Sequence, residues 1–296
     1  TSYMASSNQM PIMTNSESIL QFGNNAYGKP ATALNILRET IVGRELFDFA
    51  FRQYAQRWKF KRPTPEDLFR TIEDASGVDL DWFWRGWFYS TDHVDIALEQ
   101  VNQLTINTQD PEVEKAWQEQ QENAEPESLT TQRNADVNYK IHQQPDLTDF
   151  YNENDDYTVT NADRNKYQEL IEGLNEEQRE MLKNGSNFYV LDFVNKGGLV
   201  MPILLDLQFE DGSKEHVRIP AEVWRRSPEK VSKLLIRDKT LTQVVVDPNW
   251  ETADVDTSNN YWPARAVPSR IELFKREDRN KSMMEDFNEE LESGND

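Results

Sequence analysis

Apolar side chains recur at helical spacing through the first third of the chain and predict a cluster of helices. Pro30 suits the first turn of a helix, because its fixed φ is already helical and its missing N–H would have no partner there. This helix is expected to run to Gly43, so Tyr27 should lie just before it begins. The next helix starts near Arg44, and we expect its apolar face to be buried: Phe47, Ala50, Phe51, Tyr54 and Trp58.

Two further helices are predicted by sharper end signals. Thr64 can cap the third helix, Pro65 fits its first position and Gly77 ends it. Asp79 can cap the fourth, which carries a dense apolar surface: Leu80, Phe83, Trp84, Trp87 and Phe88. Each large side chain contributes about 1.5–3 kcal/mol when fully buried, so this cluster can anchor a helical subdomain.

The pattern changes twice after these helices. One strand is predicted from Val94 to Ile106, and Gln, Asn, Glu and Asp then dominate residues 107–186. That composition is typical of a flexible or loosely packed segment, although residues 111–122 and 167–182 favour polar helices. The segment is therefore interpreted as an insertion between a helical part and a β part.

Alternating apolar and polar positions from residue 187 onward predict a series of short strands. Residues 188–194 and 199–209 are expected to form a tight hairpin around the glycine pair Gly197-Gly198. A second turn is predicted at Asp211-Gly212, and further strands are expected at 233–237 and 241–246. Short strands separated by turns favour an antiparallel β-sandwich.

Together these patterns predict an α+β protein in four parts. They are a helical subdomain (1–106), a polar insertion (107–186), a β-sandwich (187–275) and an acidic, mobile tail (276–296).

Composition narrows the possible partners. The formal net charge of -21 disfavours binding to a nucleic-acid backbone or to an anionic membrane. No apolar run approaches the length of a membrane span. The chain has no cysteine, which removes thiolate zinc sites and disulfides. The cellular compartment stays open.

Two separated blocks of the sequence carry short runs of distinctive residues. The first block contains Tyr27-x-Lys29-Pro30-Ala31, Gly43-x-x-x-Phe47, Pro63-Thr64-x-x-Asp67 and Ser76-Gly77-x-x-Leu80. The second contains Asn195-Lys196-Gly197-Gly198, Ile219-Pro220-Ala221-Glu222 and Asp247-Pro248-x-x-Glu251. In this order the blocks resemble the C-terminal portion of bacterial aminopeptidase N-type zinc metallopeptidases, the gluzincin group. Pro30 departs from that pattern, since many members carry glycine at its position.

The resemblance implies a role for one residue of this chain. In the family, the tyrosine of the first run lies opposite the zinc and donates its hydroxyl to the oxyanion of the tetrahedral intermediate, so Tyr27 is the implied catalytic residue. The alternative is a tyrosine held near a helix start by packing and a hydrogen bond. The substrate implied is a peptide.

Zinc ligands are not expected in this chain. Zinc peptidases of this group need His-Glu-x-x-His on one helix, whereas the histidines here are His93, His142 and His216. We therefore expect the zinc site in an upstream catalytic half, with this chain as the downstream piece and inactive alone. A non-catalytic acidic interaction or scaffold module is the alternative function.

Several other polar groups are weaker candidates. Asp254-x-Asp256-x-Ser258 superficially resembles a calcium loop but lacks the required glycine and closing glutamate. His93 and His216 are expected to be ordinary surface residues rather than metal ligands. Trp224, with the two arginines that follow it, is expected to pack over the sandwich edge, and an anionic docking point is the alternative.

Overall fold

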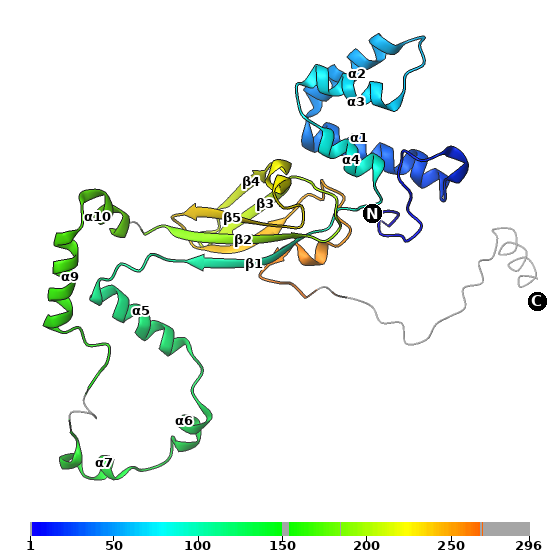
Figure 1. Cartoon of the computed structure of the whole chain (residues 1–296). Coiled ribbons are helices and arrows are strands. Elements are labelled where there is room, and N and C mark those ends of the chain that lie inside the picture. The colour runs from blue at the N-terminus through cyan, green and yellow to red at the C-terminus, as the bar shows by residue number, and fades with distance from the viewer. Residues whose placement is uncertain (1, 150–153, 184, 267, 269–296) are drawn as a thin grey trace, which may run out of the picture. The chain divides into compact units, whose positions relative to one another are not determined.

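A computed structural model describes residues 2–149, 154–183, 185–266 and 268 of the chain. It contains helices followed by two antiparallel sheets, which confirms the predicted α+β class (Figure 1). The chain divides into two units, Thr1–Ala264 and Arg265–Asp296. The tail predicted for 276–296 lies outside the described residues.

The first unit opens with the predicted helices. Their bounds are Asn24–Gly28 (a π-helical turn, η2), Lys29–Ile36 (α1), Leu37–Ile41 (η3), Arg44–Trp58 (α2), Pro65–Ser76 (α3) and Asp81–Tyr89 (α4). Gly43 and Gly77 follow helix ends at positive φ values of 91° and 68°, which glycine adopts without steric cost. The helix predicted from Pro30 begins earlier than expected, so Tyr27 lies inside a helical turn.

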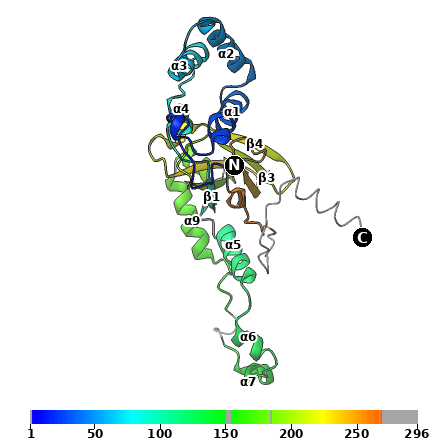
Figure 2. The ribbon, with the colours of Figure 1, turned by 90° about the vertical axis from the view of Figure 1, so that its right-hand side faces the viewer.

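Aromatic side chains form the core of these helices. The rings of Phe69 and Trp84 stack with centroids 4.4 Å apart, and the predicted apolar surface of α4 is fully buried. Helices α2 and α3 lie side by side in both views (Figures 1 and 2). The expected burial of the α2 stripe is wrong for Phe51, which is 43% exposed, although Phe47 and Ala50 are buried.

Two sheets follow, and their buried faces pack a common apolar core. One has the order β1-β2-β5 and the other β4-β3-β6-β7, with all pairs antiparallel. The strands are Ile96–Leu104 (β1), Asn187–Asn195 (β2), Ile203–Phe209 (β3), Lys214–Ile219 (β4), Lys230–Arg237 (β5), Leu241–Val246 (β6) and Tyr261–Trp262 (β7). Alternate side chains of β2 and β3 are buried, as a two-layer sandwich requires.

The hairpin predicted around Gly197-Gly198 is wrong. Strands β2 and β3 lie in different sheets, and the glycine pair instead carries the chain from one sheet to the other. His93 explains the difference, because its backbone pairs with Gly197 and Leu199, and a Cβ at Gly197 would collide with the His93 carbonyl. The second predicted turn is a hairpin, since β3 and β4 pair around Gly212.

The segment 107–186 is inserted between neighbouring strands. Leu104 at the end of β1 pairs with Phe188 near the start of β2. The helices between them are Pro111–Ala124 (α5), Leu129–Asn134 (α6), Lys140–Gln143 (α7), Asn161–Gly173 (α9) and Glu176–Lys183 (α10). None of their described side chains is buried, in agreement with the low apolar content. Across the described residues, no helix combines the length and apolar character needed to cross a bilayer.

Candidate functional site

Tyr27 lies on a turn of helix that is wider than an α-helical turn. The backbone N–H of Lys29 donates to the carbonyl of Asn24, five residues earlier, which defines a π-helical turn. The Tyr27 side chain is 68% exposed, and the Phe22 ring contacts it edge-on with centroids 5.9 Å apart. Single π turns inside helices occur frequently at functional sites. The turn therefore presents the Tyr27 phenol outward, with an aromatic neighbour at its side.

The opposite side of the turn is fixed by a buried amide. Asn25 is fully buried, and its Nδ2 donates to the Met10 carbonyl at 2.8 Å, the Pro11 carbonyl at 3.2 Å and the Tyr3 hydroxyl at 3.2 Å. One side chain thus ties the turn to the N-terminal segment at three points. A buried amide is held in place by such bonds, because leaving its donors unpaired would cost free energy.

A buried lysine fixes the same side of the turn. Lys29 is 3% exposed, and its ammonium donates to Gln9 Oε1 at 2.8 Å and to the Ser90 carbonyl at 3.3 Å. Gln9 in turn donates through Nε2 to the Thr91 carbonyl at 2.6 Å. Burial lowers the pKa of Lys29 to about 8, and the nearby Asp92 carboxylate opposes that change.

Asn25 and Lys29 are four residues apart and share one buried face, while Tyr27 lies between them in sequence and faces outward. Sequence reasoning quoted Lys29 as part of a motif but gave neither it nor Asn25 a structural role. The i, i+4 spacing of these two polar residues was the one feature of the sequence that could have placed them on the same helix face. Their burial depends on partners in other segments, which for Lys29 are 20 and 61 residues away, and the local pattern does not reveal those partners.

The described side chains do not bring together a set of ligands that suits zinc. His93 precedes β1, His142 lies in α7 and His216 lies in β4 beside Asp206. Of the described side chains, the group of three close enough to share an ion is Glu73, Asp79 and Asp81, which includes no histidine. Zinc sites in proteins are built mainly from His and Cys ligands.

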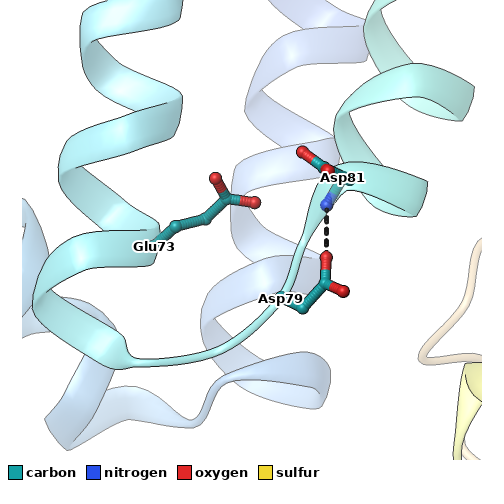
Figure 3. A group of neighbouring side chains, drawn as sticks. All are labelled: Glu73, Asp79 and Asp81. Carbon is teal, nitrogen blue, oxygen red and sulfur yellow. Dashed lines mark hydrogen bonds between the residues drawn. The ribbon is translucent and has the colours of Figure 1, made fainter.

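The acidic group lies where α3 turns into α4 (Figure 3). Its three carboxylates approach within 4.8 Å of one another. Glu73 accepts from the Leu80 N–H at 2.9 Å and Asp79 accepts from the Asp81 N–H at 3.2 Å, so two of the acids cap the start of α4. Burial raises the pKa of Glu73. These bonds give the acids a structural role in the connection.

The same acids line a cavity of about 710 Å³. Its walls include the aromatic rings of Trp82, Trp84 and Trp224. Arg70, Arg85 and Arg225 also line it, and none of these three forms an ion pair within the described structure. The cavity thus combines apolar walls with charges of both signs, and its volume is within the range of ligand-binding pockets.

The remaining sequence candidates have structural roles. Asp254 is buried and accepts from the backbone N–H groups of Ile96 and Asp256, and burial raises its pKa to about 6. This carboxylate joins β1 to the loop before β7 rather than forming a calcium loop. Trp224 is buried and donates to the Met201 carbonyl at 2.8 Å, as expected of a residue packed on the sandwich.

Two comparisons with known proteins were made for this sequence. A scan against family models finds no match, and a search of curated proteins finds no match.

Proposed function

We propose that this chain is the C-terminal portion of a zinc-dependent aminopeptidase-like enzyme that hydrolyses peptide bonds. Tyr27 donates its hydroxyl to the oxyanion that forms at the scissile carbonyl. The observation that carries this proposal is the exposed phenol on a π-helical turn, which buried Asn25 and Lys29 hold from behind. The motif resemblance at Tyr27-x-Lys29 supports the same role.

An oxyanion donor must be both accessible and fixed. A hydrogen bond stabilises the transition state most when the donor is already oriented, because no free energy is then spent on reorganisation during the reaction. Tyr27 combines a solvent-facing side chain with a backbone anchored at several points. Phe22 limits the directions in which the ring can turn.

The metal chemistry belongs to another part of the protein in this proposal. Zinc would supply the activated water, and its ligands are expected in the upstream catalytic half. The isolated chain mixed with zinc and a chromogenic aminopeptidase substrate should show no turnover above a zinc-only blank. Metal-dependent turnover from this chain alone would contradict the proposed division of roles.

The decisive experiment restores the upstream half and replaces Tyr27 with phenylalanine. Removing one oxyanion donor typically lowers kcat by about 10²–10³-fold, and KM should change little because the bond forms mainly in the transition state. Tyr89→Phe is a matched control, since Tyr89 is also partly exposed but donates to Glu66. An unchanged kcat in Tyr27→Phe would assign Tyr27 to packing.

A non-catalytic acidic interaction or scaffold module is the second candidate. The cavity between α3, α4 and the Trp224 segment favours it, because its aromatic walls and unpaired arginines suit recognition of a polypeptide. An upstream sequence without His-Glu-x-x-His would favour this candidate over the enzyme. Hydrolysis by the restored protein would exclude it as the main function.

A further inference from the structure

The Lys29 ammonium is a buried charge that the proposed chemistry does not use. Lysine is almost never fully buried without a compensating partner, yet the two acceptors of its side chain are a neutral amide and a backbone carbonyl. Its charged neighbour among the described residues is Asp92, in the segment that follows α4. A charge in this position is costly to keep, so its contacts require an explanation.

Those contacts join three parts of the chain behind Tyr27. The Lys29 backbone N–H closes the π turn onto Asn24, while its side chain reaches Gln9 in the N-terminal segment and Ser90 after α4. One residue therefore closes the turn and also fixes its position. The ammonium carries three donors and the neutral amine keeps two, so both side-chain contacts can persist when a proton is lost.

We propose that the Lys29 side chain is a positioning residue that holds the π turn in the orientation that aims Tyr27 outward. The catalytic meaning of this orientation rests on the proposed function, whereas the positioning itself does not. Lys29 is not a catalytic residue in this scheme, because it lies on the buried side of the turn.

The groups that face the Lys29 side chain come from two other segments of the chain. Facing it are the Gln9 amide from the N-terminal segment, and the Ser90 carbonyl and Asp92 carboxylate from the segment that follows α4. The nearby Tyr3 hydroxyl is bonded to Asn25 on the same face. Burial lowers the Lys29 pKa to about 8, so the buried position favours the neutral amine and the turn should tighten as pH rises from 7 to 9.

The first experiment does not depend on enzymatic activity. In the full chain, NMR signals of the Tyr27 ring and of the amides from Asn24 to Gly28 are followed from pH 6.5 to 9.5. We expect a shared transition near pH 8 that is absent in Lys29→Arg, because arginine stays charged across this range. Lys59→Met, at an exposed lysine, is the control and should keep the transition.

Two results would overturn the positioning role. One is a flat titration of the Tyr27 signals in the unmodified chain, which does not depend on any variant folding. The other is a transition that survives in Lys29→Arg, since it would then belong to another group. Lys29→Met, if folded, lacks both side-chain contacts and should show no transition near pH 8.

The second experiment separates this inference from the proposed function. In the protein with its upstream half restored, kcat should rise about tenfold more between pH 7 and pH 9 in the unmodified protein than in Lys29→Arg, because only about one lysine in ten is neutral one unit below its pKa. KM should not follow this profile. A transition near pH 8 without any hydrolysis would retain the positioning role and reject the enzyme. Hydrolysis that depends on Tyr27 but lacks the Lys29-dependent pH profile would retain the proposed enzyme and reject the positioning role.

Discussion

Helices α3 and α9 begin with the same local signal but differ in what they bury. In each, a threonine precedes the first turn and an aspartate three residues later accepts from its N–H: Asp67 from Thr64 at 2.8 Å and Asp163 from Thr160 at 3.0 Å. The helices are similar in length, with 12 and 13 residues. Yet α3 buries three side chains and α9 buries none.

The comparison separates what starts a helix from what stabilises it. A cap satisfies free N–H groups at the first turn, but an isolated helix of this length is marginal in water. Helix α3 packs its apolar side against the aromatic core, where Phe69 stacks on Trp84. The apolar residues of α9, including Leu170, are only half-buried. Tertiary burial should therefore dominate the stability of α3 and contribute little to that of α9.

The largest expected effect comes from truncating one apolar side chain in each helix. Ile72 is fully buried in α3, so Ile72→Ala should lower the free energy of unfolding by about 2–5 kcal/mol. Leu170→Ala in α9 should lower it by less than about 1 kcal/mol, because little apolar area is withdrawn from water there. Urea unfolding of both variants, followed by tryptophan fluorescence, measures the difference.

Equal losses in the two variants would break the comparison. They would mean that α9 is as tightly coupled to the folded core as α3. A Gln168→Ala variant, at an exposed position of α9, controls for a change in helix propensity alone. It should unfold at the same urea concentration as the unmodified chain.

Much of the helical part could be predicted because its signals are local. Gly43 and Gly77 end helices, Pro65 begins one, and the apolar spacing of α4 identifies its buried face. Each of these depends on residues within a turn or two in the sequence. The positions of β2 and β3 were likewise predictable from alternation, since one face of each of these strands is buried.

Features set by distant residues could not be predicted. The Gly197-Gly198 pair is typical of a hairpin turn, but its backbone bonds to His93, and strands β2 and β3 on either side of it lie in different sheets. The π turn around Tyr27 likewise depends on Asn25 and Lys29 finding partners in other segments. The exposure of Tyr27 follows from those contacts, so the motif suggested a role without fixing the geometry.

A second prediction extends the comparison to acids in two environments. Burial raises the pKa of Asp254 in the sandwich to about 6, whereas the Thr160 N–H lowers the pKa of Asp163 at the exposed cap of α9 to about 2. For Asp254 the native state binds a proton more tightly than the unfolded state. Its contribution to stability is therefore present below about pH 4 and is lost as pH rises through 6, by on the order of 2 kcal/mol.

Unfolding free energies of the unmodified chain and of Asp254→Asn, measured from pH 4 to 7, test this sign. The difference between them should favour the unmodified chain most at pH 4 and decrease toward pH 7. Asp163→Asn is the matched control, and its difference should stay flat from pH 4 to 7, since the stability from a pKa lowered to about 2 is lost only below about pH 4. A pH-independent difference for Asp254→Asn would show that its pKa is not raised.

The smallest effect should come from the caps that the two helices share. Thr64→Ala should lower the global free energy of unfolding by about 0.5–1 kcal/mol, because α3 unfolds together with the core that it packs against. Thr160→Ala removes a hydroxyl that accepts from the Asp163 N–H at 3.2 Å, and it should leave the global value unchanged. Instead, amide hydrogen exchange in the first turns of α9 should accelerate several-fold, since that helix opens by local fluctuations. A global loss in Thr160→Ala as large as that in Thr64→Ala would mean that the cap of α9 supports the whole fold, and burial would then not be what distinguishes the two helices.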